Sequence, residues 1–241
     1  MALITGATSG IGLEIARLLA PRYDLFLVSR DKSKLLELKK TLQTKVSVLA
    51  IDLSEENAAQ KVFSAARDVD VLVNNAGFGV RGEIVDADVS KVSAMLRLNI
   101  ITLTELSMLF GQRMKERKRG YILNVASVAA YQPVPYLASY SASKSYVLHF
   151  TEALAQELKD YGVYVTCLCP GVTTSNFYQT MGKNVSGASA KDVAALGVRA
   201  LFNSKTTVTF GLKNKVRVWL VRLLPRTVVA RLSKRVMRGF G

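Results

Sequence analysis

The stretch TGATSGIG at residues 5–12 decides the fold, because it joins a short apolar run to an amphipathic pattern. The run Ala2–Thr5 predicts a strand, and the residues after it predict a helix. Gly6 allows a sharp turn, Gly10 allows the backbone to approach a pyrophosphate, and Gly12 allows the helix to pack closely on a sheet. The N-terminus of that helix offers unpaired N–H groups to phosphates. The spacing is G-x3-G-x-G, so the position between strand and helix, more than the pattern itself, indicates a dinucleotide-binding turn.

Short apolar runs alternate with longer amphipathic stretches along the chain, which is typical of a parallel sheet with crossover helices. We expect strands at Ala2–Thr5, Asp24–Ser29, Val46–Ile51, Val71–Asn74, Gly120–Ala126, Val163–Leu168 and, weakly, Thr206–Phe210. We expect helices at Ile11–Leu19, Lys32–Leu42, Glu55–Arg67, Asp88–Lys118 and Ser139–Tyr161. The pattern predicts an α/β fold, a doubly wound parallel sheet of the Rossmann type. We expect a single domain, 1–241, with a core over 1–210 and a basic amphipathic helical extension over 211–241.

The composition narrows the class of protein. A chain of 241 residues with 49% hydrophobic and 21% charged residues can bury one core, and this excludes a disordered chain and a disulfide scaffold. Cys167 and Cys169 lie two apart in an apolar run, so we expect both on one side of a strand, buried and reduced. The single histidine, His149, is expected to pack, and no metal site is expected. Without a signal peptide or a long enough apolar run, we expect a cytoplasmic protein.

Ser29 and Arg30 end the second expected strand, where the adenine ribose of a bound dinucleotide would lie. A carboxylate at this place would bind the ribose hydroxyls of NAD and repel a 2′-phosphate, whereas an arginine pairs with that phosphate. The sequence therefore favours NADP(H) over NAD(H). The alternative is that Arg30 is only an exposed residue at a helix start, and Asp31 beside it either caps the helix or reaches the ribose.

The motifs and their order resemble those of the short-chain dehydrogenase/reductase (SDR) family. Beyond the glycine turn, the matching residues are Asp52-Leu53, NNAG at 74–77, Asn99, Ser127, YSASK at 140–144 and PG at 170–171. The resemblance covers roughly residues 1–200. It implies a nicotinamide-dependent oxidoreductase that interconverts a ketone or aldehyde and an alcohol.

The chemistry also follows from the residue types. Tyr140 and Lys144 are four apart, so they share one face of a helix. A nearby ammonium lowers the pKa of a phenol, which is ordinarily about 10, and makes Tyr140 usable as a general acid–base. Ser127 follows the fifth strand and would hold the carbonyl oxygen. The spacing of 13 residues from Ser127 to Tyr140 and the start of a helix after Pro135 select Tyr140 over the other hydroxyls nearby, which are Tyr131, Tyr136, Ser139 and Ser141.

The resemblance implies further roles. Lys144 would also bind the nicotinamide ribose, Asn99 would hold a water that links Lys144 to solvent, and Asp52 would accept the adenine amino group. The full set expected at the cofactor is Gly6, Thr8, Ser9, Gly10, Ile11, Gly12, Ser29, Arg30, Asp52, Leu53, Asn75, Ala76, Gly77, Tyr140, Lys144, Pro170, Gly171, Thr173 and Ser175. Ser175 stands where the family usually has threonine, and it keeps the hydroxyl.

Substrate specificity is expected in three segments, Phe78–Glu83, Tyr131–Leu137 and Val172–Ala190, whose apolar and aromatic residues suggest an apolar ketone or an acyl chain. We therefore expect an NADP(H)-dependent carbonyl reductase or alcohol dehydrogenase. The alternatives are an NAD-dependent dehydrogenase and a non-catalytic dinucleotide sensor or scaffold, which would not need an activated phenol. The resemblance implies a homodimer or tetramer through the helices at 88–118 and 139–161.

The charge is concentrated at the C-terminus. Of the net +15, residues 193–241 contribute 11 basic residues and no acidic one. Pro225 is expected to divide two helices, each with an apolar stripe: Val216, Trp219, Leu220 and Leu223 or Leu224 in the first, and Val228 or Val229, Leu232 and Val236 in the second. Such helices suit peripheral binding to an anionic membrane. Alternatively, the stripes close over the substrate cleft or a dimer partner. No nucleic-acid-reading motif is present, so nucleic acid is not expected as a partner.

Overall fold

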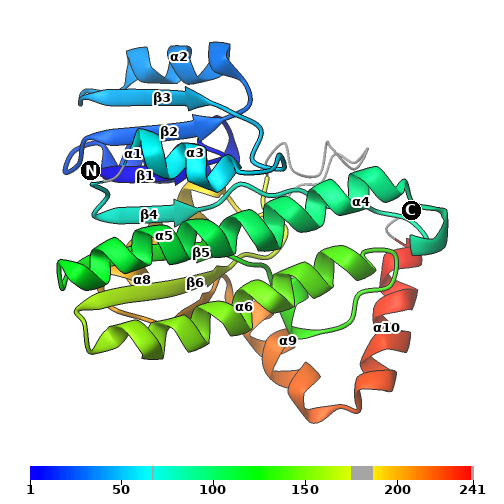
Figure 1. Cartoon of the computed structure of the whole chain (residues 1–241). Helices are drawn as coiled ribbons and strands as arrows, with labels where there is room; N and C mark the ends of the chain where they lie inside the picture. Colours follow the sequence, from blue (N-terminus) through cyan, green and yellow to red (C-terminus); the bar gives the residue numbers. More distant parts are fainter. Residues whose placement is uncertain (67, 175–186, 240–241) are drawn as a thin grey trace.

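The computed structural model describes residues 1–66, 68–174 and 187–239. Seven parallel strands form one sheet in the order β3-β2-β1-β4-β5-β6-β7 (Figure 1). They are β1 (Ala2–Thr5), β2 (Leu25–Ser29), β3 (Val46–Ala50), β4 (Val71–Asn74), β5 (Gly120–Val125), β6 (Val163–Cys169) and β7 (Thr207–Thr209). The strand order reverses between β1 and β4, so the carboxyl ends of these two strands open the crevice in which doubly wound sheets bind ligands.

Helices cover both faces of this sheet, and the last two helices form a hairpin at the C-terminus. The helices are α1 (Gly10–Leu19), α2 (Lys32–Thr41), α3 (Ala58–Ala65), α4 (Val89–Leu96), α5 (Leu103–Glu116), α6 (Ala138–Lys159), α8 (Ala190–Phe202), α9 (Leu212–Leu223) and α10 (Arg226–Gly239). One buried cluster joins α1, α2 and α8 to the sheet, and a second joins α3, α5 and α6 to the opposite face. Figure 1 shows the second layer in front of the strands. The predicted fold class is confirmed.

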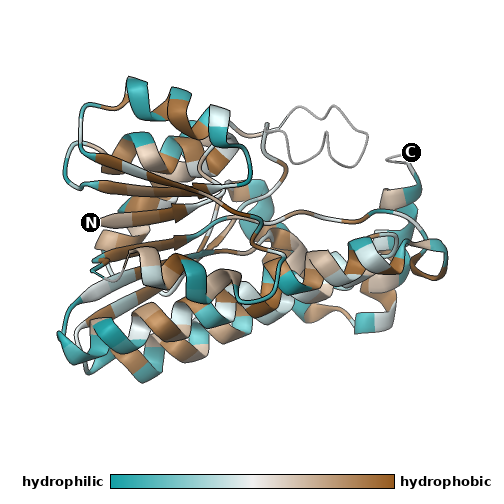
Figure 2. Cartoon of the chain, turned by 45° about the horizontal axis from the view of Figure 1, so that its top comes forward, coloured by the Kyte–Doolittle hydropathy of each residue, from teal (hydrophilic) through white to brown (hydrophobic). Residues whose placement is uncertain are grey.

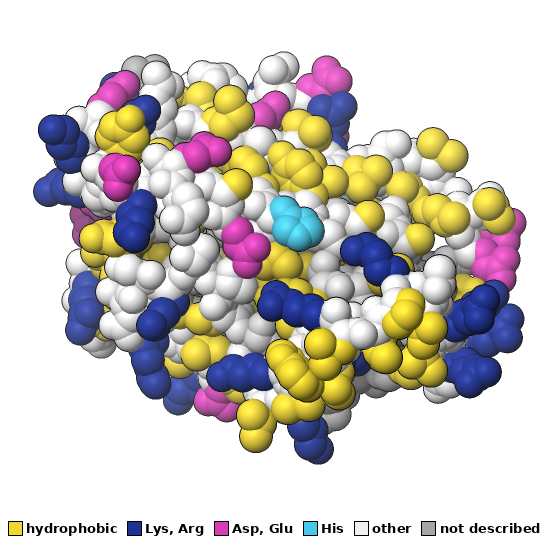
Figure 3. All heavy atoms as spheres, turned by 90° about the horizontal axis from the view of Figure 1, so that it is seen from below, with side chains coloured by type: hydrophobic (Ala, Val, Ile, Leu, Met, Phe, Trp, Pro, Cys, Tyr) yellow, Lys and Arg dark blue, Asp and Glu magenta, His cyan; other side chains and the backbone are white. Residues whose placement is uncertain are grey.

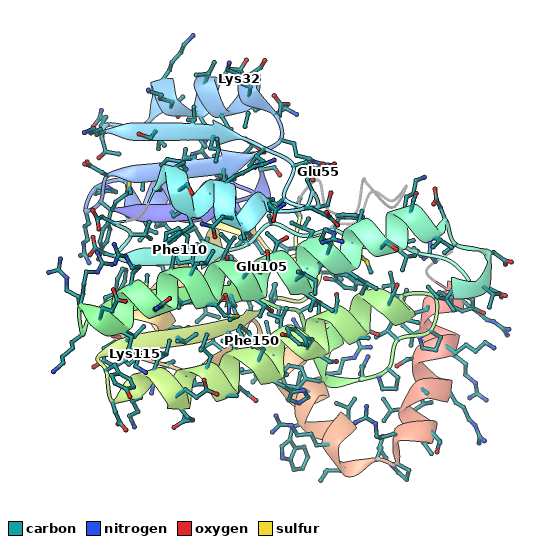
Figure 4. All side chains as sticks on the ribbon, in the orientation of Figure 1. Lys32, Glu55, Glu105, Phe110, Lys115 and Phe150 are labelled. Atoms are coloured by element: carbon teal, nitrogen blue, oxygen red, sulfur yellow. The ribbon has the colours of Figure 1, made fainter. Side chains whose placement is uncertain are left out.

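The central strands are apolar on both faces because helices cover both faces. In β2, Leu27 belongs to one buried cluster, while Phe26 and Val28 belong to the other. Figure 2 shows these strands brown along their length, between helices whose colour alternates from brown to teal. On the front layer, Phe110 of α5 (labelled in Figure 4) meets the ring of Phe63 edge to face, with ring centroids 5.1 Å apart.

The long helix predicted at Asp88–Lys118 is present, but a π-helical turn at Arg97–Thr102 interrupts it between α4 and α5. By length and composition alone, the stretch Val89–Glu116 could cross a membrane, which the sequence reasoning did not recognise. One side of it packs on the sheet, where Phe110 and Met114 are almost fully buried. A third of its most apolar window, 33%, is buried inside the molecule.

Two helices differ from expectation. Helix α3 starts at Ala58 rather than Glu55, because Asp52 accepts hydrogen bonds from Ser54 in a turn and Asn57 adopts a left-handed φ of 58°. Its predicted last residue, Arg67, lies outside the described residues. Helix α8 was not predicted at all. Its buried face contains small residues and Gly197, where an added Cβ would lie 2.8 Å from Leu168 Cδ2.

Cys167 and Cys169 lie on β6, both buried and free of a disulfide, with their sulfurs in hydrogen-bond contact at 3.7 Å, as the sequence predicts for reduced residues. The prediction that His149 packs is wrong, because its side chain on α6 is exposed. In the described ranges, no three His, Cys, Asp or Glu side chains are grouped so that they could hold a metal ion.

Candidate active site

The glycine turn between β1 and α1 is held open by the end of β4. Gly6 and Gly10 adopt φ angles of 65° and 53°, which favour glycine. Thr5 Oγ1 accepts hydrogen bonds from the backbone N–H groups of Asn75 and Ala76, both at 3.0 Å. The Asn75 side chain donates in turn to the carbonyls of Thr5 and Gly6. These contacts join the two strand ends on either side of the crevice.

The start of α1 is open to the crevice. Ser9 is the N-cap residue, and its side chain makes no capping hydrogen bond. Ser9, Gly10 and Ile11 all line the cleft. The first N–H groups of α1 and its positive dipole end are therefore available to an anion, which fits the pyrophosphate of a dinucleotide.

The structure brings nearly all predicted site residues together in this one cleft. Those that line it are Gly6, Thr8, Ser9, Gly10, Ile11, Ser29, Arg30, Asp52, Leu53, Asn75, Ala76, Gly77, Ser127, Tyr140, Lys144, Pro170, Gly171 and Thr173. Gly12 lies behind the lining, where an added Cβ would collide with the Asn75 side chain and the Gly6 carbonyl. Ser175 lies outside the described residues.

Sequence reasoning missed five lining residues as cofactor or catalytic contacts: Ile51, Phe78, Leu98, Val125 and Ala126. Three of them, Ile51, Val125 and Ala126, are neighbours in sequence of predicted strand-end residues, which was the available signal. Phe78 directly follows Gly77 and stood among the expected specificity residues. Leu98 lies in the π-helical turn, directly before the predicted Asn99.

Tyr140 and Lys144 lie one turn apart on α6 and face the cleft. Lys144 is almost fully buried, and its Nζ donates a hydrogen bond of 2.8 Å to the carbonyl of Val125. The same Nζ lies 5.9 Å from the centre of the Tyr140 ring. Burial disfavours the ammonium and lowers the pKa of Lys144 to about 8.

Asn99 is buried in the π-helical turn, immediately behind the cleft. Its Nδ2 donates to the carbonyl of Phe78 at 3.0 Å and to Ser143 Oγ at 3.1 Å, and its Oδ1 accepts from the N–H of Phe78. A Cβ added to Gly77 would lie 2.9 Å from Asn99 Oδ1 and 3.5 Å from Lys144 Nζ. Asn99 thus fixes the Gly77–Phe78 segment against Lys144. π-helical turns are frequent at functional sites.

The hydroxyls near Tyr140 differ in their surroundings. Ser127 lines the cleft just past β5, and its Oγ accepts from the N–H of Ala129 at 3.1 Å. Tyr131 donates to Cys169 Sγ, and burial raises its pKa, so it is a poor proton-transfer group. Tyr136 accepts a hydrogen bond from Arg238 at the end of the chain. Within the described lining of the cleft, Tyr140 is the tyrosine present.

One positively charged side chain and two side chains with hydroxyl groups meet in the cleft at the end of β2. Ser29 Oγ and Thr8 Oγ1 lie 3.0 Å apart, and Arg30 stands beside them with a side chain 72% exposed. Asp31 caps α2 by accepting from the N–H of Lys34, which settles one of its two expected roles. Arg30 pairs at 3.7 Å with Asp52. Burial acts against the charge of Asp52, but hydrogen bonds from Ser54 and the Arg30 guanidinium outweigh it and lower the pKa of that carboxyl.

The C-terminal hairpin contacts the far side of the cleft. Pro170 and Gly171 follow β6, and a Cβ on Gly171 would collide with the side chain of Asn214 on α9. The Arg222 guanidinium lies 5.6 Å from the centre of the Tyr131 ring, and Arg81 donates to the carbonyl of Met237. Two of the three expected specificity segments therefore touch the extension, and most of the third, 175–186, lies outside the described residues.

Known proteins are similar to this chain in sequence and in fold. Residues 1–186 match a family model described as short chain dehydrogenase. The ketoacyl reductase HetN of a Nostoc species is 31% identical, over 99% of this chain and 88% of its own length. A solved short-chain dehydrogenase from Sphingobium yanoikuyae in complex with NADPH superposes with a TM-score of 0.83 at 25% identity, over 93% of this chain and 96% of that one. A short-chain dehydrogenase/reductase from Burkholderia phymatum in complex with NAD gives 0.84 at 25% identity, over 91% of each chain.

Proposed function

Since the chain belongs to the short-chain dehydrogenase/reductase family of oxidoreductases, we propose that it interconverts a ketone or aldehyde and an alcohol by hydride transfer with NADP(H). The observation that carries the proposal is the meeting of Tyr140, Lys144 and Ser127 in one cleft with an uncapped helix start and a glycine turn. A module that only bound the dinucleotide would not need the first three residues.

Each residue of the site has a separate role in the reaction of the carbonyl group. The bound nicotinamide supplies the hydride when the carbonyl is reduced. Tyr140 gives its proton to the carbonyl oxygen as negative charge develops there, and Ser127 Oγ holds the same oxygen by a hydrogen bond. The Lys144 ammonium stabilises the phenolate that remains on Tyr140. Asn99 keeps the Gly77–Phe78 segment in place beside Lys144, and we assign to Asn99 the role of holding the water that returns the proton from solvent.

The preference for NADP(H) rests on the end of β2. Arg30 is mostly exposed and lines the cleft beside the Ser29 and Thr8 hydroxyls, a donor set that fits a 2′-phosphate. The carboxylate of Asp31 is engaged in capping α2, so it is turned to the helix rather than offered to a ribose. The observation that favours the NAD-dependent alternative is the ion pair between Arg30 and Asp52, because the carboxylate partly offsets the charge of Arg30.

Arg30→Ala is expected to raise the Kd for NADPH by about tenfold and to leave the Kd for NADH unchanged, because one charge-assisted hydrogen bond is lost. Arg30→Asp is expected to reverse the preference toward NADH. Quenching of protein fluorescence on titration with each cofactor measures both. Lys34→Ala is the matched control: it removes a like charge one helical turn away, outside the cleft lining, and should change neither Kd. Equal binding of both cofactors by the unaltered chain would refute the preference.

We propose an apolar carbonyl substrate, including the acyl-chain class. The supporting residue in the cleft lining is Phe78, and the supporting likeness is the whole-chain match to a ketoacyl reductase. A screen of 3-oxoacyl thioesters and bulky apolar ketones, read by NADPH oxidation, tests it. Turnover of small polar carbonyls alone would overturn the substrate class but leave the reaction type standing.

We also propose a homodimer through the outer sides of α5 and α6. Met108 of α5 and Ile101 of the preceding π-helical turn expose much of their apolar surface, and the rings of Tyr146 and Phe150 stack on α6 (Figure 4 labels Phe150). Met108→Arg is expected to convert the dimer into monomers in sedimentation velocity, because a buried unpaired charge is unfavourable. A monomeric unaltered chain at micromolar concentration would contradict the proposal.

A further inference from the structure

The C-terminal hairpin of α9 and α10 carries an apolar stripe that the rest of the molecule does not cover. In α9, the stripe residues recur at spacings of three and four, so they share one face of the helix. They are Leu212, Val216, Trp219, Leu220 and Leu223, and Leu212 and Leu223 are 77% and 63% exposed. In α10, Val228, Leu232 and Val236 form a second exposed row. Figure 1 shows the hairpin projecting below α6.

Other residues attach the hairpin to the body. The side of α9 that is less exposed contains Asn214, Val218 and Val221, on the opposite face of the helix from the stripe. In α10, Val229 and Ser233 are buried instead of Val228 and Leu232. The stripe is therefore not what holds the hairpin in place. The expectation that the stripe closes over the substrate cleft is wrong for the single chain. Other residues of the hairpin do contact the expected specificity segments 78–83 and 131–137.

Basic side chains border the stripe on both sides. In α9, Lys213 and Arg217 lie to one side of it and Lys215 and Arg222 to the other, as the helical period requires. Together α9 and α10 contain nine Lys and Arg residues and no Asp or Glu. In the part of the chain that the structure describes, none of the nine forms a salt bridge. Figure 3 shows hydrophobic side chains gathered on the underside, with Lys and Arg around them.

We propose that this hairpin docks the enzyme on an anionic lipid surface, with the stripe of α9 in the interface and the basic side chains on lipid phosphates. An amphipathic helix with apolar residues, a tryptophan and flanking cations has the composition of interfacial helices. The positive charge of the hairpin distinguishes between a second copy of the chain and a lipid surface as the partner of the stripe. A second copy docking on this face would bring two clusters of like charge together, and an anionic bilayer would neutralise both.

Docking would set the bilayer beside the cleft. Arg222 and Arg238 of the hairpin reach Tyr131 and Tyr136, which belong to an expected specificity segment. Arg81, in another such segment, is bonded to Met237. An enzyme held in this way meets apolar substrates where they partition. The docking itself does not depend on the proposed reaction, and its test needs no substrate.

Trp219 is the single tryptophan of the chain and is 59% exposed on the stripe, so it is a built-in probe. Vesicles of phosphatidylglycerol and phosphatidylcholine in equal parts are expected to shift its fluorescence to shorter wavelength and to protect it from acrylamide. Phosphatidylcholine vesicles alone should do neither. The bound fraction, measured by vesicle flotation, should fall as salt is added.

Leu220→Gln with Leu223→Gln is expected to lower partitioning to the anionic vesicles by about tenfold, because apolar contact with the interface is lost without a change of charge. The matched control, Leu18→Gln with Leu36→Gln, replaces two exposed leucines on α1 and α2 and should bind as the unaltered chain does. Equal flotation of both variants would show adsorption by net charge alone and would overturn the proposal. A shift of Trp219 fluorescence that follows protein concentration without vesicles would assign the stripe to a second copy, which also overturns it.

Discussion

Tyr140→Phe is expected to lower kcat for carbonyl reduction by about a thousandfold, because the carbonyl oxygen then receives its proton from water instead of a positioned acid. The ring stays in place, since phenylalanine keeps all the apolar atoms of a side chain that is only 7% exposed. The Kd for NADPH should therefore change by no more than about twofold. Stopped-flow measurement of NADPH oxidation, with a substrate found by the carbonyl screen, gives both quantities.

Tyr146→Phe is the matched control for this substitution. Tyr146 lies on the same helix, and its hydroxyl is 3.0 Å from Thr104 Oγ1, outside the lining of the cleft. Its loss should leave kcat unchanged. If Tyr140→Phe kept most of the activity, Tyr140 would not be the proton donor. If neither the unaltered chain nor the variants reduced any carbonyl while all bound NADPH, the non-catalytic sensor would be the better description.

The sequence was sufficient for the sheet because its strands are apolar on both faces and end at turn residues. The predicted ends of β1 and β4 are correct to the residue, and those of the other strands differ by one residue or so. The cleft was predictable because motif residues such as Ser29, Ser127 and Pro170 stand at or just after the ends of strands. Carboxyl ends of parallel strands meet at one edge of the sheet, so these residues meet there.

What the sequence could not show depends on contacts far apart in the chain. Helix α8 was not expected, and it contains Gly197, a poor helix former, at the place where Leu168 of β6 approaches most closely. The π-helical turn around Asn99 is a shift in backbone hydrogen bonding that no residue type announces. The contacts of Arg222 and Arg238 join the extension to residues about a hundred positions earlier, and no periodicity reports such pairs.

Lys144→Met is expected to inactivate the enzyme and yet make the folded protein more stable at neutral pH. Burial lowers the pKa of Lys144 from its ordinary 10.5 to about 8, so the folded state holds this proton less tightly than the unfolded state. Below pH 8 the buried charge therefore destabilises the fold by about 3 kcal/mol. That cost disappears as the pH rises from about 8 to 10.5. Methionine has similar length and no charge, and losing the hydrogen bond to Val125 offsets about 1 kcal/mol of the gain.

Urea unfolding without cofactor, at pH 7 and at pH 10, separates this effect from other titrations, because every group except Lys144 is common to both proteins. The variant should exceed the unaltered chain by about 2 kcal/mol in free energy of unfolding at pH 7, and the difference should vanish or reverse at pH 10. Lys159→Met, on the exposed end of α6, should show no such pH-dependent difference. A variant less stable than the unaltered chain at pH 7 would mean that Lys144 is solvated or paired well enough to favour the fold. Its charge would then be held in the cleft without cost, and the enzyme would not trade stability for a lysine beside Tyr140.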